Sequence, residues 1–240
     1  MEKKEMGRIV AIGGFGSGNG ICLDKHAVEM TGKAHPNVLY LPTAGSDGVE
    51  NIENATNKFG SLGCCVKPLC LITERYTEEE LDSLFAWADM IYVGGGDTIS
   101  MMKVWRTHGV DVRLEKIYRT DAAVLAGISA GAICWFACGH SDSESFHKKE
   151  GWHFCWAEGM LDLFHMAYCP HYDDEGRDSF DEMLREKDLV GLAMENDTAF
   201  VENKDRRYFI RCSPDANAYE LKYENEVLKK TALEMVDLVD

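Results

Sequence analysis

Short runs of apolar residues alternate with amphipathic stretches along the first half of the chain. The apolar runs are continuous, which is typical of strands that are buried on both faces of a parallel sheet. These runs cover residues 8–12, 37–41, 65–71, 90–93 and 122–128. Helical periodicity covers residues 19–31, 49–62, 77–88 and 112–120 between them. The order predicts an α/β fold of three layers, in which helices cover both faces of a mostly parallel sheet.

The pattern changes in the C-terminal part of the chain. It predicts a strand at 164–169, a helix at 175–186, and short strands at 189–194, 199–202 and 208–212. The last two strands flank Asn203-Lys204-Asp205, an arrangement typical of a small β-hairpin. Residues 139–158 are polar and predict an ordered loop. No repeat or linker interrupts the chain, so we expect one domain over residues 1–240.

One short motif points to chemistry. Residues 127–131 have the sequence Gly-Ile-Ser-Ala-Gly, which matches Gly-x-Ser-x-Gly. In a nucleophile elbow a serine lies on a strained turn between a strand and a helix, and small neighbours let the backbone bend. An apolar strand precedes Ser129, and residues 130–136 can begin a buried helix. The motif therefore predicts Ser129 as a nucleophile; the alternative is a tight turn without chemistry.

A serine nucleophile needs a base and donors for the oxyanion. His171 follows the predicted strand 164–169, so we expect it at the same carboxyl edge of the sheet as Ser129. The glycine-rich run 94–96, which Asp97 follows, exposes backbone amides to an anion, and the amide of Ala130 is the natural second donor.

Several carboxylates could orient the base. Glu195 ends a predicted strand at the same edge, Asp173 lies two residues after His171, and Asp142 lies in the polar loop. Triads recur in unrelated sequence orders, so the residues alone leave this choice open. A metal site made from His140, His153, His171 and Asp173 is an alternative use of these side chains.

Charge and cysteine content narrow the class of protein. The net charge of −16 disfavours nucleic acid and anionic membranes as partners. Nine cysteines without a Cys-x-x-Cys pair indicate reduced thiols, mostly in the core, and hence a cytoplasmic protein. We expect neither a signal peptide nor a membrane span, because no long apolar run occurs.

Three segments together resemble one family: Val93-Gly94-Gly95-Gly96-Asp97-Thr98, the run from Gly127 to Ala132, and Pro170-His171-Tyr172. The chain is similar to the peptidase E-like serine peptidases, the group of α-aspartyl dipeptidase and cyanophycinase, over roughly residues 8–212. The resemblance implies a fold like that of the class I glutamine amidotransferases.

The resemblance also assigns roles to residues. It implies Ser129 as nucleophile, His171 as base, and the amides of Gly95 and Ala130 as oxyanion donors. Glu195 resembles the triad glutamate of α-aspartyl dipeptidase, although its spacing from the preceding Gly-Leu pair differs by one residue, and Asp173 and Asp142 rank behind it.

The implied activity is hydrolysis of short peptides with an acidic residue, usually Asp, on the amino side of the cut bond. Arg177 would pair with that carboxylate, and Gly96 and Asp97 would contact the substrate. No cofactor and no metal are expected, and both a monomer and a homodimer stay open. The alternatives are a hydrolase of another amide or ester and a catalytically silent protein that binds a small ligand.

Overall fold

An eight-stranded sheet forms the centre of the computed structural model, which describes residues 7–16, 20–148 and 151–238. Five neighbouring strands run parallel in the order β3-β2-β4-β5-β1. They are β1 (Arg8–Ile12), β2 (Asn37–Leu41), β3 (Cys65–Pro68), β4 (Met90–Val93) and β5 (Val124–Ile128). Antiparallel β10 (Thr198–Asn203) and β11 (Arg206–Arg211) extend the sheet beyond β1, and β14 (Met235–Asp237) closes that side.

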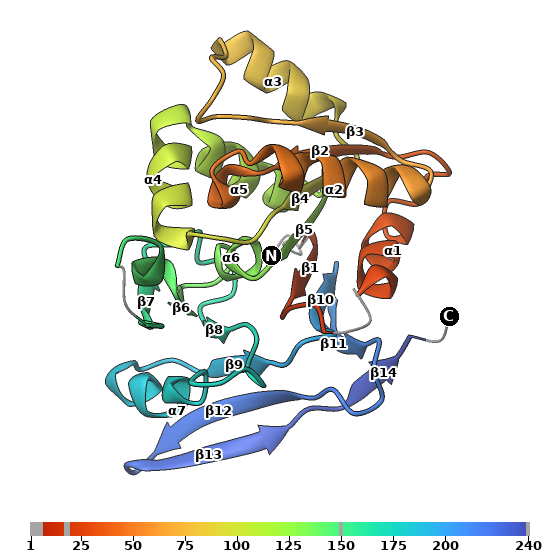
Figure 1. Cartoon of the computed structure of the whole chain (residues 1–240). Helices are drawn as coiled ribbons and strands as arrows, with labels where there is room; N and C mark the ends of the chain where they lie inside the picture. Colours follow the sequence, from red (N-terminus) through yellow and green to blue (C-terminus); the bar gives the residue numbers. More distant parts are fainter. Residues whose placement is uncertain (1–6, 17–19, 149–150, 239–240) are drawn as a thin grey trace, which may run out of the picture.

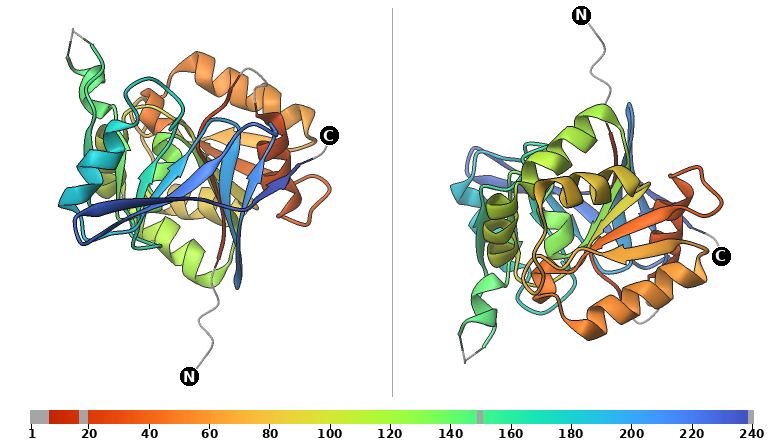
Figure 2. Two further views of the ribbon diagram at one scale, coloured as in Figure 1. Left: turned by 90° about the horizontal axis from the view of Figure 1, so that it is seen from below. Right: turned by 90° about the horizontal axis from the view of Figure 1, so that it is seen from above.

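Helices cover both faces of this sheet, because alternate residues of its strands point to opposite sides. Val10 and Ile12 pack with α1 (Ile21–Glu29) and α2 (Val49–Ser61). Ile9 and Ala11 belong to the core on the other face. That core includes α3 (Glu78–Trp87), α4 (Thr98–His108), α5 (Val110–Thr120) and the short α6 (Ala130–Ile133). Figure 2 shows α2 and α5 on opposite sides of the strands. The predicted three-layer α/β core is confirmed.

A second sheet of six strands packs against the first, in the order β13-β12-β9-β8-β6-β7 (Figure 1). Its strands are β6 (Cys138–Ser141), β7 (Cys155–Glu158), β8 (Ala167–Cys169), β9 (Gly191–Met194), β12 (Ala218–Glu224) and β13 (Val227–Ala232). The ring of Tyr168 on β8 stacks on Phe136 at 4.4 Å, and its hydroxyl donates to the carbonyl of Ala11 at 3.2 Å. The two sheets therefore share one apolar core.

The second sheet is where the sequence prediction fails most. Residues 139–158 are not simply a loop, because most of β6, a 3-10 turn at Ser143–Phe146 and β7 lie within them. The helix expected over 175–186 is a short α7 (Ser179–Met183) followed by a 3-10 turn, Leu184–Glu186. The hairpin about residues 203–205 is confirmed as β10–β11. The β12–β13 hairpin was not predicted, since charged residues interrupt its apolar positions and most of its residues are partly or fully exposed.

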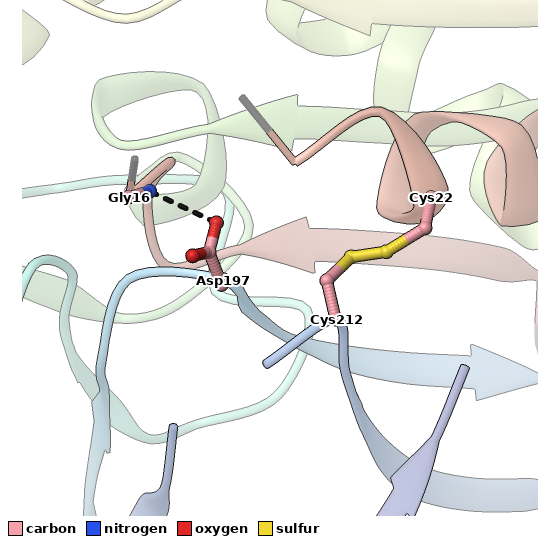
Figure 3. The surroundings of a disulfide bond; sticks show 4 residues. All are labelled: Gly16, Cys22, Asp197 and Cys212. Atoms are coloured by element: carbon pink, nitrogen blue, oxygen red, sulfur yellow. Dashed lines mark hydrogen bonds between the residues drawn. A yellow bond between two sulfur atoms is a disulfide. The ribbon is translucent and has the colours of Figure 1, made fainter. Parts of the chain in front are cut away.

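A disulfide joins Cys22 of α1 to Cys212, which follows β11 (Figure 3). The expectation of reduced thiols is wrong for this pair, while the other seven cysteines are free. The bond fixes the start of α1 to the end of the β10–β11 hairpin. Among the described residues, no helix is long and apolar enough to cross a lipid bilayer.

The disulfide closes a sequence separation of 190 residues, so it strongly restricts the unfolded chain. We expect Cys22→Ser to lower the free energy of unfolding by about 2–4 kcal/mol, or the melting temperature by about 5–15 °C. Thermal unfolding without reductant measures this, and Cys65→Ser, which changes an exposed free cysteine, is the matched control. Nine reactive thiols in the unreduced, denatured protein would contradict the disulfide.

Candidate active site

Ser129 lies on a strained turn between β5 and α6. Its backbone has φ 55° and ψ −115°, a conformation that residues with a side chain rarely adopt. A Cβ on Gly127 would lie 2.2 Å from the carbonyl oxygen of Gly131, and a Cβ on Gly131 would lie 2.2 Å from that of Val93. Both glycines of the motif are therefore required by close backbone packing. The turn has the form of a nucleophile elbow.

The carboxyl end of β1 brings Ser129 and His171 to one place. The amide of Ser129 donates to the carbonyl of Ile12 at 3.2 Å, and the amide of His171 donates to the next carbonyl, that of Gly13, at 3.1 Å. Ser129 is partly exposed, and His171 has a left-handed backbone with φ 52°. In the described part of the chain no hydrogen bond joins the two side chains. Catalytic contacts of this kind often tighten only when substrate binds.

The partner of the imidazole is an amide, not a carboxylate. The Nδ1 atom of His171 lies 2.8 Å from Oδ1 of Asn196. The Nδ2 atom of Asn196 donates to Asp173 at 3.1 Å and to Asp174 at 2.9 Å. Gly14 leaves room for this pair, since a Cβ there would lie 2.0 Å from Asn196 Oδ1 and 2.3 Å from His171 Nδ1.

These contacts fix the tautomer of His171. Ionised carboxylates only accept hydrogen bonds, so the NH2 group of Asn196 must face Asp173 and Asp174. The amide oxygen then faces Nδ1 of His171, which must carry the proton. The other ring nitrogen, Nε2, keeps its lone pair. Neutral His171 is therefore held in the tautomer that a general base needs.

Glu195 does not contact His171. Its carboxylate accepts from the amide of Asn217 at 2.7 Å and from the hydroxyl of Tyr219 at 3.2 Å. β9 ends at Met194, so Glu195 faces β12 while Asn196, in the turn that follows, faces the imidazole. The one-residue offset from the family pattern was the signal in the sequence that could have identified Asn196.

The two other candidate acids have different places. Asp173 accepts from both nitrogens of Asn196, and so acts on His171 only through that residue. Asp142 lies 3.3 Å from the guanidinium of Arg177. Asp174, which the sequence did not single out, has a carboxylate oxygen 3.8 Å from Nδ1 of His171.

Burial lowers the pKa of His171 below its usual value near 6.5, and the positive charge of Arg177 lowers it further. The hydrogen bond to Asn196 and the charges of Asp174 and Asp142 act in the opposite direction but do not cancel the effect of burial. The imidazole is therefore neutral at pH 7 and able to accept a proton.

Two backbone amides suit a developing oxyanion. A Cβ on Gly95 would lie 3.3 Å from Cβ and 3.8 Å from Oγ of Ser129, so the backbone of Gly95 lies against the serine side chain. Ala130 is the first residue of α6 and is buried. Neither amide donates to another residue in the described parts of the chain, so both are available to a ligand.

The three residues expected to bind substrate have other contacts. Arg177 is buried, donates to the carbonyl of His140 at 3.0 Å, and pairs with Asp142. Asp97 caps α4 through the amide of Ser100 and lies 2.7 Å from Nε2 of His147. Gly96 forms the turn before it, with φ 136°. None of the three lines the cavity next to Ser129.

That cavity has a volume of about 520 Å³, within the range usual for small-ligand sites. Ser129, Gly94 and Gly95 form one end. The walls come from the loop after β1, the strands β2 and β4, and α2, and they include Phe15, Tyr40, Tyr92 and Lys58. No sequence pattern indicated the contribution of α2, because its lining residues belong to none of the motifs.

The alternative of a metal site finds no support in the geometry. His140 is fully buried, and its Nε2 lies 2.9 Å from the hydroxyl of Ser179. Among the described residues, no three His, Cys, Asp or Glu side chains converge as metal ligands would.

Known proteins resemble this chain at the levels of sequence and fold. The model of peptidase family S51 matches residues 9–208. The uncharacterized peptidase YgaJ of Bacillus subtilis (strain 168) is 31% identical over 200 residues, which cover 81% of this chain and 82% of that protein.

Two solved structures share the fold. A putative peptidase E protein from Listeria monocytogenes EGD-e aligns with a TM-score of 0.64 and 20% identity, over 87% of this chain and 100% of the Listeria chain. A peptidase from an acI-B1 Actinobacterium aligns with a TM-score of 0.65 and 19% identity, over 96% of this chain and 98% of that one.

The lowered pKa of His171 predicts how the reactivity of Ser129 depends on pH. The imidazole must be neutral to accept the serine proton, so reactivity should persist below pH 6.5 and fall only as the pH drops through the lower pKa. The rate of Ser129 labelling by a fluorophosphonate between pH 4 and 9 measures this, and Ser129→Ala is the blank. An acid limb with its midpoint at or above about pH 6.5 would contradict the assigned surroundings of His171.

Proposed function

The chain belongs to peptidase family S51 and is a serine-type peptidase, and we propose that Ser129, His171 and Asn196 form its catalytic centre. One observation carries the proposal. The strained elbow at Ser129 and the amide of His171 bind consecutive carbonyls at the end of β1, while Asn196 fixes the imidazole from the other side. Asn196 acts as a positioning residue here, in the place that a carboxylate takes in other triads.

The proposed reaction is hydrolysis of a peptide bond through an acyl-enzyme. Nε2 of His171 takes the proton of the Ser129 hydroxyl, and Oγ attacks the carbonyl carbon of the substrate. The amides of Gly95 and Ala130 hold the resulting oxyanion. The protonated His171 then gives its proton to the leaving amine as the C–N bond breaks.

Water completes the cycle in the proposed mechanism. His171, neutral again, takes a proton from a water molecule, whose oxygen attacks the ester carbonyl of the acyl-enzyme. The tetrahedral intermediate uses the same two amides, and its collapse returns the proton to Oγ of Ser129. Asn196 stays neutral throughout and keeps the proton of Nδ1 in place.

The proposed substrate is a short peptide with an acidic residue on the amino side of the cut bond. This preference rests on the resemblance to α-aspartyl dipeptidase, and the cavity beside Ser129 has a volume usual for small-ligand sites. A hydrolase of another amide or ester would use the same catalytic centre.

A panel of dipeptides tests this function. We expect the protein to hydrolyse Asp-X dipeptides with a higher kcat/KM than Leu-X or Lys-X dipeptides. We expect Ser129→Ala to lose at least about 10³-fold in kcat while keeping its fold, since the hydroxyl forms the bond to the substrate. Circular dichroism checks the fold. Full activity in Ser129→Ala would disprove the mechanism, and equal rates for all dipeptides would disprove the acidic preference.

The choice of orienting residue makes a separate prediction. We expect Asn196→Ala to reduce kcat about 10²-fold or more with little change in KM, because the tautomer of His171 matters for proton transfer rather than for binding. Glu195→Gln is the matched control at the neighbouring position, and we expect it to stay within about threefold of the original enzyme. Steady-state kinetics of the two variants measure this. A large loss of kcat in Glu195→Gln and none in Asn196→Ala would identify Glu195 as the triad acid.

A further inference from the structure

One face of α2 lines the cavity that ends at Ser129. Asn51, Asn54, Ala55 and Lys58 are spaced three, four and seven residues from the first, so they lie on one side of the helix. The side-chain amides of Asn51 and Asn54 make no hydrogen bond to other described residues. Two free polar side chains and one charged side chain therefore face the same space as the nucleophile.

Lys58 has a fixed position in this wall. Its ammonium lies 2.5 Å from a carboxylate oxygen of Asp24, which is fully buried in α1. The rings of Phe15, Phe59 and Tyr92 surround the same ammonium, with centroids at 4.7, 5.1 and 5.1 Å. A lysine held by one carboxylate and three aromatic faces loses little further entropy when a ligand binds.

The Asp24–Lys58 pair presents its positive end to the cavity. The side chain of Asp24 has no exposed surface, whereas that of Lys58 is 24% exposed and lines the cavity. An ammonium has three N–H donors, and the contact with Asp24 needs only one of them. Within the described part of the chain, Lys58 is also the one charged side chain that lines the cavity. An anion entering from the side of Ser129 meets a donor before it meets the buried carboxylate.

We propose that this cavity holds the side chain of the residue before the cut bond, and that Lys58, assisted by the amides of Asn51 and Asn54, recognises its carboxylate. The proposal rests on the peptidase activity proposed above. It assigns the preference for an acidic residue to Lys58 on α2 and not to Arg177, whose guanidinium is buried and paired with Asp142. The substrate class is a short peptide with an Asp or Glu side chain at that position.

The comparison of Asp-X with Asn-X dipeptides isolates the charge, because the two side chains have nearly the same shape. We expect Lys58→Met to lower the ratio of kcat/KM for Asp-X over Asn-X at least about tenfold. Lys67→Met is the matched control, since Lys67 packs over Trp87 at 4.3 Å and does not line the cavity. It should keep the original ratio.

Loss of Lys58 alone leaves Asp24 buried without its partner, which lowers stability for a reason unrelated to recognition. The double variant Asp24→Asn/Lys58→Met removes both charges and should show the same fall in the ratio. If either folded variant keeps the original Asp-X preference, the assignment to Lys58 is overturned while the peptidase proposal stands.

A second readout needs no turnover. N-acetylaspartate should slow fluorophosphonate labelling of Ser129 more than N-acetylasparagine does, both in the original protein and in Lys67→Met. In the double variant the two compounds should slow the labelling of Ser129 to the same extent. Equal protection in the original protein would overturn the proposal for Lys58, whereas absence of labelling and of hydrolysis would overturn the proposed function itself.

Discussion

The end of β1 is the constraint on which the site depends. Its last carbonyls accept the amides of two segments that are far apart in sequence, the elbow after β5 and the loop after β8. Both bonds require β1 to lie between β5 and β10 with an open carboxyl end, as the strand order provides. Gly14 then passes beneath the imidazole, where any side chain would collide with His171 or Asn196. One strand end thus binds the backbones of both Ser129 and His171.

The second sheet positions His171 and Asn196 through two of its strands. β8 leads into His171, β9 leads into Asn196, and the two strands are parallel neighbours. The amide of Tyr172 donates to the carbonyl of Met194 at 2.9 Å and holds the two loops in register. Asp197 continues the connection, since its carboxylate accepts from the amide of Gly16 at 2.9 Å beside the disulfide (Figure 3). His171, Asn196 and the loop after β1 are therefore one connected unit.

Much of this arrangement could be predicted from the sequence, because the core strands and the elbow depend on local patterns. Continuous apolar runs predicted the parallel strands. Thr77 and Glu80 form the capping box expected at the start of α3. The second sheet was largely missed, since its strands are short and carry polar residues. Asn196 and Lys58 were missed for another reason. Their proposed roles rest on contacts with His171 and Asp24 that no spacing in the sequence shows.

In the proposed catalytic centre, Asn196 holds neutral His171 with its proton on Nδ1, and so leaves Nε2 free for Ser129. Nitrogen-15 NMR of the imidazole at pH 7.5 tests it most directly, because the two ring nitrogens have different shifts when protonated and when not. We expect a protonated Nδ1 and an unprotonated Nε2 in the original protein, with loss of this preference in Asn196→Ala. A proton on Nε2 in the original protein would contradict it.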